Sequence, residues 1–86
     1  EAHNCVCVGL TGLGKNDEAM EACNISIKLT PNHWESLKTR ATLNYMAQNF
    51  TKSLDDFRLA LINAPDDTGI TNILKQNIGV VKSKID

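Results

Sequence analysis

Apolar residues recur every three or four positions along most of the chain, which is the spacing of the buried face of an amphipathic helix. The clearest case predicts a helix over about 68–84, with these residues facing inward: Ile70, Ile73, Leu74, Ile78, Val81 and Ile85. The same spacing predicts earlier helices over about 1–13, from Asn16 or Asp17 to Leu29, over 33–47 and over 51–63. No stretch has the alternation of a strand pair, so the expected fold class is all-α.

Prolines and short polar side chains mark the expected helix ends. Pro31 and Pro65 prevent the second and fourth helices from continuing. Side chains that can accept an early backbone N–H precede three helices. They are Asn16 or Asp17 for the second, Asn32 with Glu35 as a capping box for the third, and Asp66 or Asp67 for the fifth.

The two prolines also reveal an internal repeat, whose period is the difference between their positions (65 − 31 = 34). The same shift places Phe57 on Cys23, and it places the small residues Ser53 and Ala60 on Ala19 and Ser26. Small residues allow neighbouring helices to approach closely. The positions expected at the tightest helix contacts are Ala19, Ser26, Ala41, Ser53 and Ala60.

A helix–turn–helix unit of this period, with small residues at fixed places and a closing proline, resembles the tetratricopeptide repeat. The second unit carries the resemblance with Leu37-x2-Arg40-Ala41, Ser53-x3-Phe57, Ala60 and Pro65, and the first unit matches it more loosely. The resemblance covers the whole chain. It implies a fragment of an α-solenoid with repeats over 1–33 and 34–67, followed over 68–86 by the first helix of a third repeat or a C-terminal capping helix.

Composition narrows the classes of function. The chain has 86 residues, a net charge of −1 and 42% hydrophobic residues, which favours neither nucleic acid nor a membrane surface as a partner. It begins Glu-Ala-His-Asn, without Met, and we interpret it as a piece of a longer protein. The odd count of three cysteines is most simply explained by reduced thiols, which favours a cytoplasmic location.

Three motifs that suggest chemistry have simpler explanations. The stretch from Gly9 to Lys15 fits G-x-x-x-x-G-K, but Asn16 stands where a phosphate-binding loop needs Ser or Thr, and no parallel sheet is predicted. The spacing of His3, Cys7, Cys23 and His33 matches no zinc motif. The doublets Asp55-Asp56 and Asp66-Asp67 are expected on solvated faces or at caps. We therefore expect no catalytic residue, metal or cofactor.

The resemblance implies that the first helix of each repeat lines a concave groove that holds a peptide or a partner helix. The expected partner-binding residues are Asn4, Val8, Glu35, Lys38, Thr42, Tyr45, Met46, Asn72 and Gln76, with Thr11 as a further candidate. Tyr45 is the strongest candidate, because an aromatic ring with a polar tip combines contact area with hydrogen bonding. The expected function is a non-catalytic protein-interaction module of a larger scaffold or co-chaperone-like protein.

Within the tetratricopeptide family, the sequence is similar to the arrays of large immunophilins and small glutamine-rich co-chaperones. Those arrays often bind acidic chaperone tails through Lys, Asn and Arg side chains. If the two units are the second and third repeats of such an array, those places hold Cys5, Glu35 and Thr39. If they are the first and second repeats, the places hold Asn4, Val8 and Thr39. Neither set supplies the cations. Chaperone docking through residues outside the chain is therefore the alternative. A third interpretation is that the array serves a catalytic domain elsewhere in the protein, such as a prolyl isomerase.

The first helix also suggests self-association. Val6, Val8 and Leu10 would be exposed there if no preceding repeat covered them. Self-association through these residues is a second expectation about partners.

Overall fold

The computed structural model describes residues 14–30 and 33–85, and every regular element in these ranges is an α-helix. The helices are α2 (Asn16–Leu29), α3 (Trp34–Met46), α4 (Phe50–Asn63) and α5 (Thr68–Ile85). The predicted all-α class is confirmed, and each of these helices agrees with its predicted span to within a residue or two. The helix expected over 1–13 lies outside the described residues.

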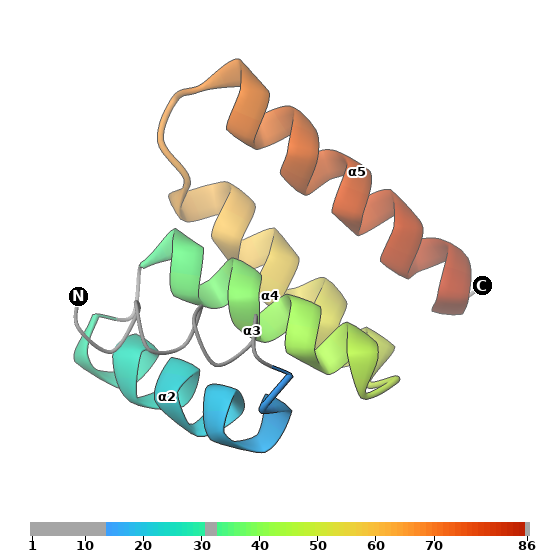
Figure 1. The fold of residues 1–86 in the computed structure, drawn as a ribbon. Helices are drawn as coiled ribbons and strands as arrows, with labels where there is room; N and C mark the ends of the chain where they lie inside the picture. Colours follow the sequence, from blue (N-terminus) through green and yellow to red (C-terminus); the bar gives the residue numbers. More distant parts are fainter. Residues whose placement is uncertain (1–13, 31–32, 86) are drawn as a thin grey trace.

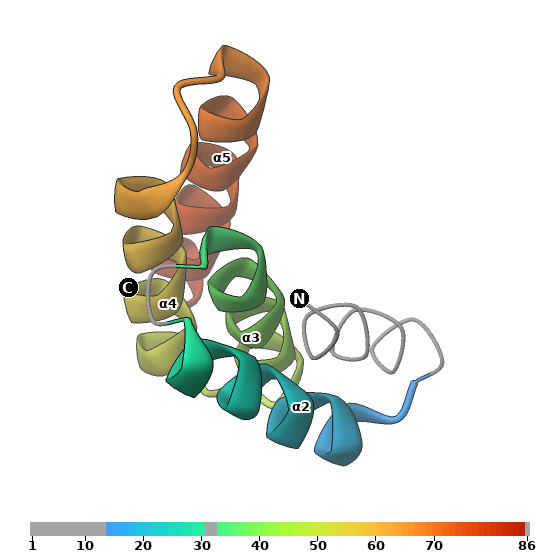
Figure 2. The same ribbon diagram turned by 90° about the vertical axis from the view of Figure 1, so that its left-hand side faces the viewer.

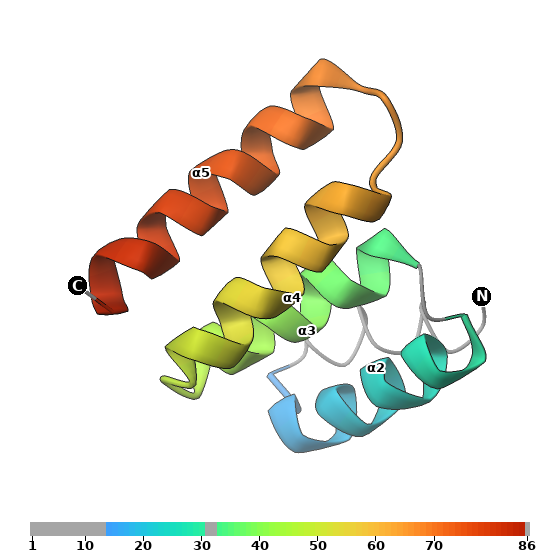
Figure 3. The same ribbon diagram turned by 180° about the vertical axis from the view of Figure 1, so that it is seen from behind.

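Each helix packs against the next one along the chain. The α3–α4 pair lies between α2 on one side and α5 on the other (Figure 1). A side view shows the same order, from α2 at the bottom to α5 at the top (Figure 2), and the view from behind shows α5 running alongside α4 (Figure 3). This sequential packing leaves α3 and α5 on either side of α4, where both helices can contribute to one surface.

The helix starts differ in part from the predicted caps. Lys15 precedes α2 and forms no side-chain cap, so the prediction of capping by Asn16 or Asp17 is wrong. His33 caps α3, its Nδ1 accepting the backbone N–H of Ser36 at 3.3 Å, in place of the expected Asn32, which lies outside the described ranges. At α5 the prediction is confirmed, because Asp67 Oδ1 accepts the N–H of Ile70 at 3.1 Å.

The turn between α3 and α4 depends on Gln48, which has a left-handed backbone with φ of 65°. The N–H of Asn49 bonds to the carbonyl of Asn44 at 2.8 Å, and the N–H of Gln48 bonds to the carbonyl of Tyr45 at 3.0 Å. These two bonds form a Schellman motif, which satisfies the last carbonyls of a helix. The motif ends α3 and reverses the chain into α4.

Helix boundaries recur with the same period as the two prolines. The start and end of α4 follow those of α2 by this offset (50 − 16 = 34 and 63 − 29 = 34), and the start of α5 follows that of α3 by it as well (68 − 34 = 34). The residues before α2 and α4 share a conformation, with φ/ψ of −88°/70° at Lys15 and −87°/67° at Asn49. Gly14 and Gln48, the residues before them, both have positive φ. Sequence and local backbone thus share one period.

The predicted small residues are all buried, with exposed fractions of at most 3% at Ala19, Ser26, Ala41, Ser53 and Ala60. Ser53 illustrates the close approach of helices, because its hydroxyl donates to the carbonyl of Ala41 at 2.7 Å. The larger core cluster joins α3, α4 and α5 around Leu37, Phe57 and Leu74. Ile73 and Ile85, predicted to face inward, are 49% and 45% exposed, so the buried stripe of α5 is narrower than predicted.

Cys23 is fully buried and disulfide-bonded. The expectation of reduced thiols is therefore wrong for this residue, and the other two cysteines, Cys5 and Cys7, lie outside the described residues. Disulfides persist mainly in oxidising compartments. The cysteines thus give no support to the predicted cytoplasmic location, which stays a prediction.

Candidate functional site

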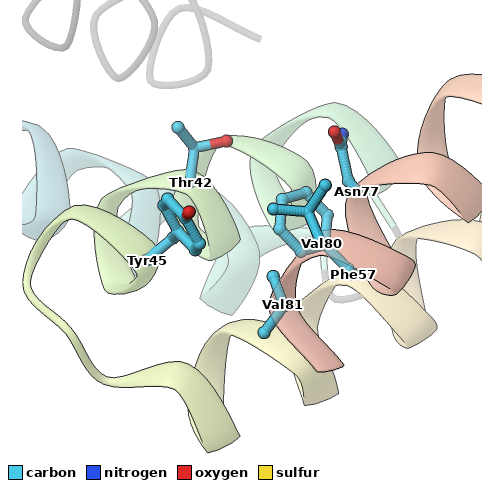
Figure 4. Close-up of a pocket in the computed structure, with 6 residues that line it drawn as sticks. All are labelled: Thr42, Tyr45, Phe57, Asn77, Val80 and Val81. Atoms are coloured by element: carbon cyan, nitrogen blue, oxygen red, sulfur yellow. The ribbon is translucent and has the colours of Figure 1, made fainter. Parts of the chain in front are cut away.

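A small pocket of about 130 Å³ opens where α3 and α5 face each other across α4. Thr42 and Tyr45 of α3 form one side, and residues of α5 form the other (Figure 4). On the α5 side, the side chain of Val80 is half-exposed to solvent. The complete lining is Thr42, Tyr45, Phe57, Asn77, Val80 and Val81.

Packing fixes the walls of this pocket. Phe57 and Val81 are 4% and 1% exposed, so they belong to the core and cannot easily move. The ring of Tyr45 meets that of Phe50 edge to face, with centroids 5.5 Å apart and planes at 65°. The hydroxyl of Thr42 donates to the carbonyl of Lys38 at 3.0 Å within its own helix. The resulting surface is mainly apolar, with the Asn77 amide and the Tyr45 hydroxyl as additional polar groups.

The structure brings two of the predicted partner-binding residues, Thr42 and Tyr45, into this pocket. Asn4, Val8 and Thr11 lie outside the described residues. The other predicted residues do not line the pocket: Lys38 is partly exposed, and Glu35, Met46, Asn72 and Gln76 are exposed.

The residues on the α5 side of the pocket were not predicted from the sequence. Val80 follows the predicted groove residue Met46 by one period (80 − 46 = 34), so the repeat would have identified it. Asn77 has no such signal, because the residue one period earlier is the buried Leu43. Asn77 lies one turn before Val81, and only the packing of α5 against α4 shows that it lines the pocket.

A second, polar cleft of about 470 Å³ lies where α2, α3 and α4 meet. At its centre the Arg40 guanidinium donates to both carboxylate oxygens of Asp56, from Nη2 at 2.7 Å and Nε at 2.8 Å. Asn44 donates to the same carboxylate at 3.1 Å, and Arg40 Nη1 donates to Asn24 Oδ1 at 3.1 Å. This network connects all three helices.

Asp56 is 5% exposed, so the prediction of a solvated acidic doublet is wrong for this residue and holds only for its exposed neighbour Asp55. The hydrogen bond to Asp56 raises the pKa of Arg40 above its ordinary value against the opposing effect of burial, and the nearby carboxylate charge adds to the increase. Arg40 thus remains charged, and the buried carboxylate keeps its cation.

Ser36 and His33 form an arrangement that superficially resembles a nucleophile and its base. Ser36 Oγ lies 3.1 Å from His33 Nδ1 and 2.7 Å from Ser26 Oγ. However, Ser36 and Ser26 are 0% and 3% exposed, which denies a substrate access to either hydroxyl. The chain of contacts ties the start of α3 to α2.

Neither a metal site nor a membrane span is found in the part of the chain that the structure describes. There, no three His, Cys, Asp or Glu side chains gather closely enough to hold an ion. None of the helices α2 to α5 is both long and apolar enough to cross a bilayer.

Comparisons with protein-family models, curated proteins and solved structures give no significant match. Any assignment of family or function therefore depends on the residues and geometry described above.

Proposed function

We propose that the chain is a helical-repeat array of the tetratricopeptide type and acts as a non-catalytic protein-interaction module. Its partner, a peptide or a helix, would bind in the groove between α3 and α5. The observation that carries this proposal is the pocket formed by Tyr45 and Val80 on a rigid floor of Phe57 and Val81. A preformed apolar pocket with a few polar groups is the usual form of a binding site.

The recurrence of the helix boundaries supports the repeat array. In such arrays each unit is one helical hairpin that buries its apolar face only against its neighbours. The buried positions of α2 and α4 recur with the same period, as in Ala19 and Ser53 or Cys23 and Phe57. This agreement is independent of the two prolines from which the period was first inferred.

The helix α5 is best explained as a closing helix. Lys75 follows Ala41 by one period (75 − 41 = 34), so a charged side chain stands where the preceding unit has a fully buried alanine. A polar outer face at this position is typical of helices that cap a repeat array. We therefore assign residues 34–67 to the second unit and α5 to the cap.

The chaperone-docking alternative receives less support from the same surface. Glu35 is exposed where that register needs a cation, so the terminal carboxylate of an acidic tail has no cationic partner at this position. The Thr39 hydroxyl donates to the carbonyl of Glu35 at 2.9 Å and supplies no charge. We accordingly propose that the groove recognises an internal segment of its partner and not a terminal carboxylate.

A random-peptide display library tests this proposal. The library is selected on the wild-type protein, and the enriched peptides are then tested on Val80→Asp, which places a charge on the pocket wall. Ile62→Asp is the matched control, because Ile62 is 76% exposed on α4 and does not line the pocket. We expect peptides that bind the wild type and the control but not Val80→Asp. Enriched peptides that bind all three proteins equally, or no enrichment, would contradict the proposal.

A further inference from the structure

The size of the pocket limits what can enter it. Its volume of about 130 Å³ is close to that of an engineered apolar cavity of about 150 Å³ that holds one benzene molecule. Phe57, Val80 and Val81 offer carbon surface to such a group. The pocket therefore suits a single apolar side chain such as Leu, and not a row of side chains.

The charges of the two lining helices restrict the partner further. The eighteen residues of α5 include Lys75, Lys82 and Lys84 and no acidic residue. Lys84 follows Val80 by four residues and so lies on the same face of α5, one turn beyond the pocket. This face is cationic at the carboxyl end of the helix.

The α3 side carries one lysine next to the pocket. Lys38 precedes Thr42 by four residues and lies one turn before it on the same face. Glu35 is the one acidic residue of α3 and lies a further turn away, whereas the charge of Arg40 is paired with Asp56 in the polar cleft. The helices α3 and α5 run in the same direction (Figure 1), and Thr42 and Tyr45 lie opposite Asn77 and Val80 (Figure 4). One lysine precedes the pocket on α3 and the other follows it on α5, so the two lie beyond opposite ends of the pocket.

From these charges and this volume we propose that the partner is an acidic segment with one apolar anchor side chain. The anchor fills the pocket, and carboxylates about one helical turn before and after it lie near Lys38 and Lys84. This inference rests on the proposed function and specifies its ligand. A basic segment would bring its charges against both lysines, which disfavours it as the occupant.

The test compares three labelled peptides by fluorescence anisotropy. The first has a central Leu with Glu three or four residues to each side, the second has Lys in place of each Glu, and the third has Ala in place of Leu. We expect the first to bind most tightly and the other two to bind at least about tenfold more weakly. Because exposed charges are screened by salt, we also expect the affinity of the first peptide to fall between about 0.02 M and about 0.5 M salt.

Variants of the protein assign the effect to individual side chains. We expect Val80→Asp to weaken the first peptide about tenfold and Lys84→Glu about threefold. Lys28→Glu is the matched control, because Lys28 is an exposed lysine at the end of α2, away from the pocket. Circular dichroism checks that each variant folds, and Val80→Ala, a smaller change, should weaken binding in the same direction.

Equal or tighter binding of the Lys peptide, or no effect of either Val80 variant, would overturn the inference. Sedimentation would also overturn it if the wild type forms a dimer and only the Val80 variants are monomeric, because a second copy of the chain would then cover the pocket. The library selection distinguishes this failure from that of the proposed function. If it yields pocket-dependent peptides without acidic residues, the acidic partner is excluded and the groove function stands.

Discussion

Arg40 and Asp56 are joined through two parallel hydrogen bonds of 2.7 and 2.8 Å, one from Nη2 and one from Nε, across the α3–α4 hairpin. The pair is partly buried, with side-chain exposures of 25% for Arg40 and 8% for Asp56. We expect its main contribution to be that it holds the hairpin in a single arrangement. Arg40 also donates to Asn24 of α2, which connects that helix to the pair.

Replacing Asp56 by Ala should lower the free energy of unfolding by about 2–4 kcal/mol, because it leaves Arg40 partly buried without its anion. Asp55→Ala is the matched control, and the exposure of Asp55 predicts an effect below about 0.5 kcal/mol. Urea denaturation measures both. Equal effects of the two substitutions would show that the buried pair does not hold the hairpin together.

Enlarging the fully buried Ala41 or Ala60 to Leu should destabilise the fold by roughly 1–3 kcal/mol, since both lie at close helix contacts. Ala47→Leu, at an exposed position after α3, is the control for the change in side-chain type. Thermal unfolding followed by circular dichroism compares the three. An unchanged melting temperature for both buried variants would argue against the repeat alignment.

Gln48→Gly should stabilise the protein by roughly 0.5–1 kcal/mol, because Gln48 has φ of 65° and glycine adopts this conformation without a steric cost. Gln48→Val should have the opposite sign, because a β-branched residue tolerates positive φ poorly. Ala47→Gly, at a neighbouring residue with φ of −84°, should lower stability. If both glycine variants lose stability equally, the left-handed turn is not the conformation in solution.

The disulfide at Cys23 predicts the number of free thiols. If it pairs within the chain, it uses two of the three cysteines, so alkylation of the denatured, unreduced protein should label one cysteine and leave Cys23 unlabelled. After reduction, all three should be labelled, and the melting temperature should fall because the unfolded chain is no longer cross-linked. Mass spectrometry identifies the labelled residues, and three labelled cysteines before reduction would contradict the disulfide.

C-terminal amidation of a bound peptide separates internal-segment recognition from chaperone-tail recognition, because it removes only the terminal charge. We expect wild-type affinity for the acidic Leu peptide to be unaffected by amidation. An acidic chaperone-tail peptide should gain affinity for the Glu35→Lys/Thr39→Arg double variant and lose it again when amidated. Micromolar, amidation-sensitive binding of that tail to the wild type would favour the chaperone-docking alternative.

Helix spans and small buried positions could be predicted from the sequence because both depend on local periodicity. Ala41 and Ser53, for example, were identified by register alone. The buried pairing of Asp56 could not be predicted, because it depends on how α3 and α4 are oriented against each other and so on whether Arg40 reaches the carboxylate. Periodicity indicates which face of a helix is apolar, and it therefore predicts that Ile73 faces inward. How much of that face is buried depends on packing, and α5 packs against one neighbouring helix.

The candidate site was predicted in part for the same reason. Thr42 and Tyr45 were expected from the resemblance to the repeat family, but Asn77 lines the pocket only through the way α5 packs on α4. His33 was not predicted as a cap, because the preceding Asn32 is of a residue type preferred at this position and Glu35 follows it three residues later.

The central claim is that the surface between α3 and α5 binds the partner. The most direct measurement is the dissociation constant of the tightest library peptide for the wild type, Val80→Asp and Ile62→Asp, measured side by side. We predict at least about tenfold weaker binding to Val80→Asp and an affinity within about twofold of the wild type for Ile62→Asp. Equal affinity for all three proteins, or a loss confined to Ile62→Asp, would place the binding surface elsewhere and contradict the account.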